Sequence, residues 1–356
     1  MNFFKWLTNI DRRWLYLLMA IVVSFPLFTN IEFKVKPNRP VKDLYNYINN
    51  FEPGETVLLS FDYSPDSLAE LNPMSKAVAY HAFKKDIRVI GIALAFPAGG
   101  GLGLDVIRGE ALNVNREILE EKGFFENLRD ETKVKTLMED MGWDFDEFKG
   151  KFTEVATAML ENNKAILESY QTIYDMIKER GMGESIFDLE DKLKITGRDW
   201  TYFGYKAGYV AVILGMGDSI KKTLETDYKG TSISEYEMFQ GNNAVKNYNN
   251  ISLIVDFAAG ASVNSWIFFC NTKYGRPVGA GVTAVMAADY YPYLQTGQLK
   301  GLMNGMRGAA DYETLNNRKG TGTAGMTSQT FAHLLIIIFI ILGNIGYFVN
   351  KKEGRK

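Results

Sequence analysis

The chain has 356 residues, of which 46% are hydrophobic and 23% charged, so it can form a full globular core. Its 40 Lys and Arg nearly balance 42 Asp and Glu, and no basic excess marks a nucleic-acid-binding protein. The single cysteine, Cys270, excludes an internal disulfide, and with only two histidines a Cys/His zinc site is not expected.

The first predicted element is an apolar segment at residues 14–31, WLYLLMAIVVSFPLFTNI. Arg12 and Arg13 precede it, and no small-residue cleavage site follows it. This pattern favours an uncleaved signal anchor over a cleaved signal peptide. Residues 1–13 would then be a cytoplasmic tail, followed by a transmembrane helix.

Between residues 32 and 330, short apolar runs alternate with helical patterns. After a short helix at 42–51, runs of strand length occupy 56–61, 88–96, 209–214, 251–257 and 277–283. Helical spacing marks 67–85, 219–228, 262–274 and 298–315. Continuous apolar strands joined by helices indicate right-handed parallel crossovers in a sheet covered on both faces. We therefore predict an extracytoplasmic α/β domain with a doubly wound, mostly parallel sheet of about five strands.

Residues 105–200 have almost no strand signal and predict a long helical insertion. Ten positions, three and four residues apart, form a stripe of which eight are apolar: Phe145, Phe148, Phe152, Val155, Met159, Asn162, Ile166, Ser169, Ile173 and Met176. Three interpretations of the stripe are open. It would pack on another helix of the insertion, dock on another subunit, or lie on a membrane. Its mixed charge disfavours the last alternative.

Ligands of a parallel sheet bind beyond the carboxyl ends of its strands. The residues expected there are Asp62, Ser64, Gly99, Gly100, Gly101, Gly215, Gly217, Asp218, Asp256 and Ser262. Asp62, Asp218 and Asp256 would suit Mg²⁺ or Ca²⁺, and the glycine turns would suit an anion bound by backbone N–H groups. Helix capping by Asp62 and Asp218, and a simple crossover at Gly99–Gly101, are the alternatives. No motif predicts a cofactor.

Tyr290, Tyr291 and Tyr293, which flank Pro292, form a candidate partner-contact surface, or else pack beneath the sheet. Residues 331–349, FAHLLIIIFIILGNIGYFV, have the length and apolarity of a membrane-spanning helix. In it, Gly343 and Gly346 offer a close-packing surface to a neighbouring helix.

The basic tail at 350–356, NKKEGRK, predicts a cytoplasmic C-terminus. Two crossings place both termini in the cytoplasm and the main domain outside the cell membrane.

We expect a non-catalytic, membrane-anchored extracytoplasmic scaffold or interaction subunit of a multi-subunit membrane assembly. Its partners would be the lipid bilayer and other membrane-protein subunits, in a homo- or hetero-oligomer, without nucleic acid. Two other functions use the carboxyl ends of the strands. One is an anchored divalent-metal-dependent hydrolase, and the other is a small-ligand sensor.

Overall fold

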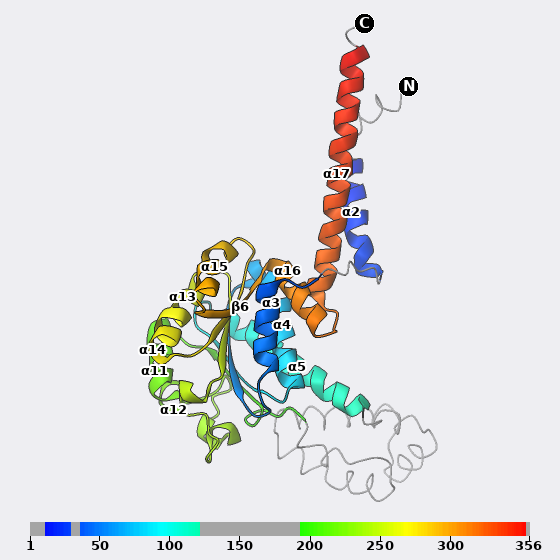
Figure 1. Cartoon of the computed structure of the whole chain (residues 1–356). Helices are drawn as coiled ribbons and strands as arrows, with labels where there is room; N and C mark the ends of the chain where they lie inside the picture. Colours follow the sequence, from blue (N-terminus) through cyan, green and yellow to red (C-terminus); the bar gives the residue numbers. More distant parts are fainter. Residues whose placement is uncertain (1–10, 30–35, 122–192, 354–356) are drawn as a thin grey trace, which may run out of the picture.

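The computed structural model describes residues 11–29, 36–121 and 193–353 (Figure 1). Six strands form one sheet in the order β3-β2-β1-β4-β5-β6, and every neighbouring pair is parallel. The strands are β1 Thr56–Asp62, β2 Arg88–Ala93, β3 Trp200–Tyr205, β4 Leu253–Ala258, β5 Val278–Val282 and β6 Leu299–Asn304. This is the Rossmann-like, doubly wound order, which reverses between β1 and β4. The predicted α/β class is confirmed, with six strands instead of about five.

The third strand is not the expected one. Residues 209–214, YVAVIL, belong to helix α11, which begins after the left-handed Gly208 (φ 92°). The third strand is β3, whose aromatic sequence WTYFGY pairs with β2 through Val89 and Trp200. A six-residue apolar run suits a buried helix as well as a buried strand, so periodicity alone does not separate the two.

The expected helix at 298–315 is also wrong in its first half. Residues 299–304 form β6, and helix α16 begins only at Gly305, whose φ of 56° turns the chain. Gly301, Gly305 and Gly308 are spaced like one face of a helix. Gly301 serves a different purpose, because a Cβ there would lie 2.4 Å from Leu44 Cβ of α3. The glycine lets α3 pack on the strand.

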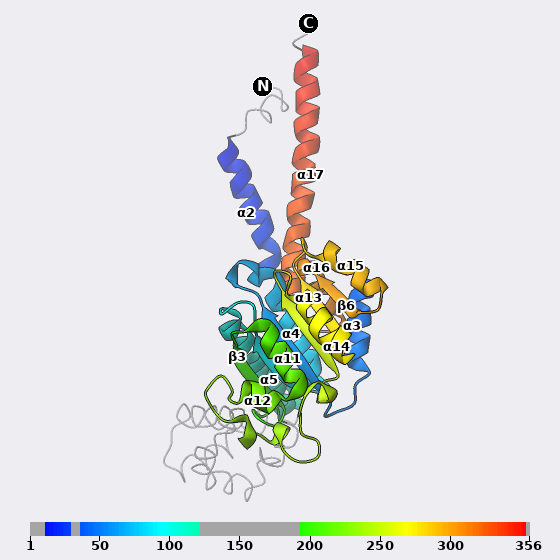
Figure 2. The same ribbon diagram turned by 90° about the vertical axis from the view of Figure 1, so that its left-hand side faces the viewer.

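Helices cover both faces of the sheet, as a doubly wound fold requires (Figures 1 and 2). The first face packs on α3 Arg39–Asn49, α4 Leu68–Lys84, α5 Gly99–Glu121 and α16 Gly305–Leu315. The second face packs on α11 Tyr209–Asp218, α12 Ile220–Leu224, α13 Ser262–Trp266, η5 Ile267–Asn271, α14 Thr272–Tyr274 and α15 Ala287–Gln295. The short turns η1 Pro65–Ser67, η2 Ile233–Glu235, η3 Glu237–Phe239 and η4 Tyr248–Asn250 lie in the connections.

Helix α5 contains the first part of the region expected to be an insertion. It packs on the sheet, and a Cβ at Gly91 of β2 would lie 2.2 Å from Ile107 Cδ1. Residues 105–121 are therefore part of the α/β core. The apolar stripe from Phe145 to Met176 lies outside the described residues and stays a prediction.

Two helices project from the same side of the domain (Figures 1 and 2). Over the described ranges, α17 Thr321–Glu353 is the one helix long and apolar enough to span a membrane, with the apolar stretch at Thr321–Phe348. Helix α2 Arg12–Phe28 has 17 residues and lies along α17, where Phe25 and Phe331 have ring centroids 6.3 Å apart. The structure thus supports one possible transmembrane helix and leaves the second one unconfirmed.

Candidate functional site

Two carboxyl side chains lie where the strand order reverses, between β1 and β4. Ser60 pairs with Asp256, and Asp62 with Ala258, so the side chains of Ser60, Asp62 and Asp256 share one face of the sheet. Both aspartates are completely buried. The reversal point is the usual ligand site of such sheets, which makes this pair the candidate site.

The Asp62 carboxylate is fully engaged by its own domain. Its Oδ1 accepts hydrogen bonds from the backbone N–H groups of Leu94 (2.8 Å) and Ala95 (2.7 Å), which follow β2. Its Oδ2 accepts a hydrogen bond from Ser60 Oγ at 2.7 Å. Three such bonds satisfy a buried carboxylate and fix the connection after β2 against the end of β1.

Asp256 has the opposite surroundings. Ser262 Oγ donates to its Oδ2 at 2.8 Å, while its Oδ1 has no partner among the described residues. Burial, and then the charge of Asp62, raise the pKa of Asp256 well above its ordinary value. Burial therefore favours the protonated form of Asp256 next to the carboxyl group of Asp62, and the two side chains form a buried acid pair.

Two tyrosines close the connection between β4 and α13 over this pair. The Tyr209 hydroxyl donates to the carbonyl of Ser262 at 2.9 Å, and the Tyr290 hydroxyl donates to the carbonyl of Gly260 at 3.1 Å. Burial, and then the charge of Asp256, raise the pKa of both phenols. Both hydroxyls therefore stay protonated and act as donors.

Tyr290 is completely buried, so its expected place on a partner-contact surface is wrong. Tyr293 packs against Tyr290 and Phe268, and Tyr291 is the exposed member of the three. Of the three tyrosines, only Tyr291, which is 42% exposed, stays available to a neighbour.

The glycines after β2 do not form an anion-binding loop. Gly99, Gly100 and Gly101 lie in the first turn of α5, where their N–H groups donate to the carbonyls of residues 96–98. A Cβ at Gly99 would lie 2.0 Å from the carbonyl oxygen of Phe61. Gly99 allows the helix to approach β1 closely, and the N–H groups of all three glycines are already bonded.

Asp218 does not join the other two carboxyl groups. It is the last residue of α11, about 14 Å along the helix axis from Tyr209, which contacts the Ser262 carbonyl. Gly215 and Gly217 lie inside the same helix, where they make room for Thr223 and Tyr274. In the described part of the chain, no three His, Cys, Asp or Glu side chains are grouped to hold a metal ion. The expected three-aspartate site is therefore not formed.

Ser64 also lies apart from the pair. It precedes the turn η1, and its hydroxyl donates to the exposed Asp66 carboxylate. That hydrogen bond lowers the pKa of Asp66. Of the expected site residues, the structure thus brings together Asp62, Asp256 and Ser262, and adds Ser60. A polar residue inside the apolar run TVLLSF was the available signal for Ser60.

Glu313 joins the α/β domain to the base of α17, and the sequence gives no local sign of this role. Its buried carboxylate accepts hydrogen bonds from the N–H groups of Gly320 (3.1 Å), Gly322 (2.9 Å) and Thr323 (2.7 Å). The Thr323 hydroxyl adds a fourth, at 2.6 Å. A carboxylate at a helix N-terminus satisfies unpaired N–H groups and complements the helix dipole. The long apolar helix is thereby fixed to α16.

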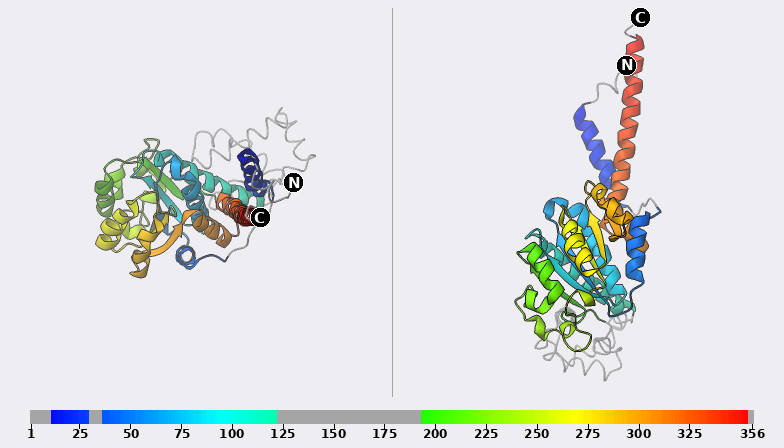
Figure 3. Two further views of the ribbon diagram at one scale, coloured as in Figure 1. Left: turned by 90° about the horizontal axis from the view of Figure 1, so that it is seen from above. Right: turned by 60° about the vertical axis from the view of Figure 1, so that its left-hand side comes forward.

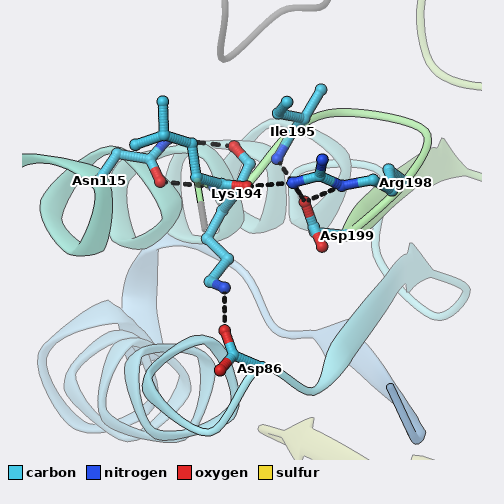
Figure 4. Close-up of polar contacts among 7 residues, drawn as sticks. Asp86, Asn115, Lys194, Ile195, Arg198 and Asp199 are labelled. Carbon is cyan, nitrogen blue, oxygen red and sulfur yellow. Dashed lines mark hydrogen bonds and ion pairs between the residues drawn. The ribbon is translucent and has the colours of Figure 1, made fainter. Parts of the chain in front are cut away.

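A second polar cluster surrounds Lys194, in the segment that leads to β3 (Figure 4). The Asn115 side chain accepts from the Lys194 N–H at 2.6 Å and donates to its carbonyl at 3.1 Å. The buried Lys194 ammonium pairs with Asp86, which precedes β2. Asp199 accepts from the N–H of Ile195 at 2.8 Å. These contacts hold the segment before β3 against α5 and the start of β2.

Comparisons of this chain with protein-family models, curated proteins and solved structures find no match. The fold and the arrangement of its residues therefore carry the functional argument.

Proposed function

We propose that this protein is a membrane-anchored, non-catalytic interaction subunit of a multi-subunit membrane assembly, with its α/β domain outside the cytoplasm. The observation that carries the proposal is α17, a helix whose apolar stretch is almost entirely exposed. Isoleucines 336, 337, 338, 340 and 341 are each at least two-fifths exposed. In water such a surface would be unfavourable, and a lipid environment covers it.

The joint at Glu313 supports a role in positioning. Four hydrogen bonds to one carboxylate fix the base of α17 on the domain, so the domain would keep a defined orientation on its anchor. A scaffold needs such an orientation, because its partner surfaces must be presented at a constant height and angle.

The buried acid pair favours a structural role over catalysis. Asp62 and Asp256 are both inaccessible, and Asp62 is saturated by two backbone N–H groups and a hydroxyl. A hydrolytic centre needs a carboxylate that can reach water or substrate. The pair instead connects the two central strands.

The basic residues that follow the apolar stretch of α17 support the proposed topology. Lys351, Lys352, Arg355 and Lys356 would lie on the cytoplasmic side, which would put the α/β domain outside. On α17, Gly343 has no atom within 4 Å of an added Cβ, so it offers a close-packing site for a neighbouring membrane helix.

The test is the mass of the full-length chain after extraction from its native membrane in mild detergent. We expect a particle larger than one chain, and we expect Gly343→Leu to shift it toward the monomer. Ile341→Leu, on the same helix, is the matched control and should leave the particle unchanged. A uniform monomer for the unmodified chain would contradict an interaction subunit.

Topology is tested separately with a membrane-impermeant thiol reagent on intact cells. Cysteine introduced as Asn249→Cys, in the α/β domain, should react at once, and Lys351→Cys should react only after permeabilisation. The native Cys270 gives little background, because burial raises the pKa of its thiol to about 12. The reverse pattern would place the domain in the cytoplasm.

A further inference from the structure

Four of the connections that follow the strands, those after β2, β3, β4 and β5, form an exposed apolar surface that the acid pair does not use, whereas the connection after β1 carries Ser64 and the exposed Asp66. We call it the apolar rim: residues 95–98 (AFPA), 207–208 (AG), 259–261 (AGA) and 284–286 (AVM). None of these residues has a polar side chain. Most are exposed, and Val285 is 86% exposed. Connections on a protein surface are normally rich in polar residues, so four apolar ones at one edge call for an explanation.

The apolar rim lies at the height where the apolar run of α17 begins. Gly325 packs on Met306, two residues after the end of β6, with an added Cβ 2.2 Å from the methionine sulfur. Thr330 lines the same small cavity as Arg307, in the first turn of α16. Phe331, where the uninterrupted apolar run starts, is therefore level with the carboxyl ends of the strands.

The sheet direction places all four loops on that side. Every strand runs toward the side of the domain from which α17 projects, so every loop that follows a strand ends there (Figures 1 and 3). Seen from above, the domain spreads to one side of α17 (Figure 3). The apolar rim thus lies beside the helix, facing along its axis, and not beneath it.

We propose that the apolar rim docks on the surface of the lipid bilayer that α17 spans. The inference rests on the proposed membrane anchoring and adds a second contact between the domain and the membrane. The loops would lie among the headgroups, with the side chains of Pro97 and Val285 reaching the acyl boundary. Tyr205 and Tyr291, each about two-fifths exposed, flank the rim, and tyrosine is enriched at this depth.

The composition of the rim favours lipid over a protein partner. Protein interfaces depend on a few large anchors, mostly Trp, Tyr and Arg, whereas the rim loops contain mainly alanine and glycine. Small apolar side chains give a shallow surface that suits a fluid layer. Lys206 and Asp289 beside the rim have opposite charges, so the contact should not require anionic lipid.

The experiment uses the full-length chain in phosphatidylcholine vesicles with brominated acyl chains, which quench a fluorophore at the lipid boundary. A fluorophore is attached at Val285→Cys in the rim, at Asn249→Cys before β4, and at Ile340→Cys in α17. We expect the rim label to lose roughly half of its emission, as for groups about 5–10 Å into the interface. The Asn249 label should be unaffected, and the Ile340 label should be quenched strongly.

The Ile340 label separates the two proposals. If it is quenched while the Val285 label stays bright and open to aqueous iodide, the anchor stands and the docking proposal fails. That result would also be expected if a protein, absent from these vesicles, covered the rim. If neither label is quenched, α17 is not in the membrane and the proposed function fails as well.

Charged substitutions in the rim provide a second readout. Ala98→Asp with Ala261→Asp should restore most of the emission of the Val285 label, because a carboxylate resists entry into the acyl boundary. Asn249→Asp is the control and should leave the quenching unchanged, and vesicles with and without anionic lipid should behave alike. Quenching that survives both rim charges would overturn the proposal.

Discussion

The two edges of the sheet are built from different residues. At the carboxyl edge, where the strands end, the four rim loops are apolar and mostly exposed, the loop after β1 carries Ser64 and the exposed Asp66, and Asp62 is buried beneath them. At the amino edge, where the strands begin, the connections carry charged and amide side chains bonded to one another. Lys194, Asn115 and Asp86 are examples, and Ser252 adds a bond to Glu55.

The two edges should therefore respond differently to substitution: the amino edge through the stability of the fold, and the carboxyl edge through its contact with another surface. Polar groups at the amino edge bond within the protein, so their loss should lower the free energy of unfolding. The most exposed side chains of the rim, such as Val285, contribute little to the core, so their loss should leave folding unchanged and affect only what the rim touches. Because all strands run in one direction, the amino edge is stabilised by hydrogen bonds within the protein, and the carboxyl edge is available for contact.

The largest effect is expected at Glu313, which sets the position of the rim relative to α17. Glu313→Ala removes four hydrogen bonds and leaves buried N–H groups unpaired, which should lower the free energy of unfolding by about 3–5 kcal/mol. Denaturation of the detergent-solubilised chain, followed by tryptophan emission, measures the loss. Glu313→Gln keeps one of the two acceptor oxygens and should cost less than the alanine variant. A change below about 0.5 kcal/mol for the alanine variant would mean that the joint does not hold the helix.

The next effect is expected at the amino edge. Asn115→Ala leaves the N–H and the carbonyl of Lys194 without their partner and should cost about 2–3 kcal/mol. The quenching of the Val285 label by brominated lipid should not change. Val285→Ser is the reciprocal control, with a stability within about 0.5 kcal/mol of the unmodified chain. If both substitutions changed stability equally, the contrast between the edges would be wrong.

The sequence places Asp62 and Asp256 at the same edge of the sheet because both stand at the ends of correctly predicted strands, but their burial as a pair is seen only in the structure. It misplaces Asp218 because YVAVIL fits strand and helix alike, and it hides β6 because three glycines happen to have helical spacing. These are local ambiguities, which packing decides.

Other features have no local signal at all. Asn115 meets Lys194 across 79 positions, and Glu313 caps a helix that begins eight residues later. The apolar rim consists of four ordinary-looking turns that become one surface only when the strands align and α17 is in place. Tertiary arrangement, and not composition, creates it.

The smallest net effect on stability is expected from two buried groups, His81 and Asp256, whose contributions change with pH in opposite directions. Burial, and then the charge of Lys85, lower the pKa of His81 to about 4, and His81 lies in the last turn of α4, toward the amino edge. Between about pH 4 and 6.5 the unfolded chain binds a proton at this histidine that the folded chain does not. Stability from His81 therefore falls as the pH falls through that range.

Asp256, beneath the carboxyl edge, acts in the other sense. Its raised pKa means that above about pH 4 the folded chain holds a proton that the unfolded chain releases, so its contribution falls as the pH rises. Each group alone gives a slope of at most about 1.4 kcal/mol per pH unit, and between pH 4 and 6.5 the two slopes oppose one another.

Substituting either residue should leave the pH dependence of stability that the other one causes. Asp256→Asn can keep the hydrogen bond from Ser262 Oγ, and relative to the unmodified chain its stability should increase as the pH rises above 4. His81→Gln should show the reverse between pH 4 and 6.5, with relative stability greatest at the acid end. Denaturant titrations of the three chains at half-unit intervals of pH measure both differences. Parallel curves for all three would mean that neither buried group changes its protonation on folding.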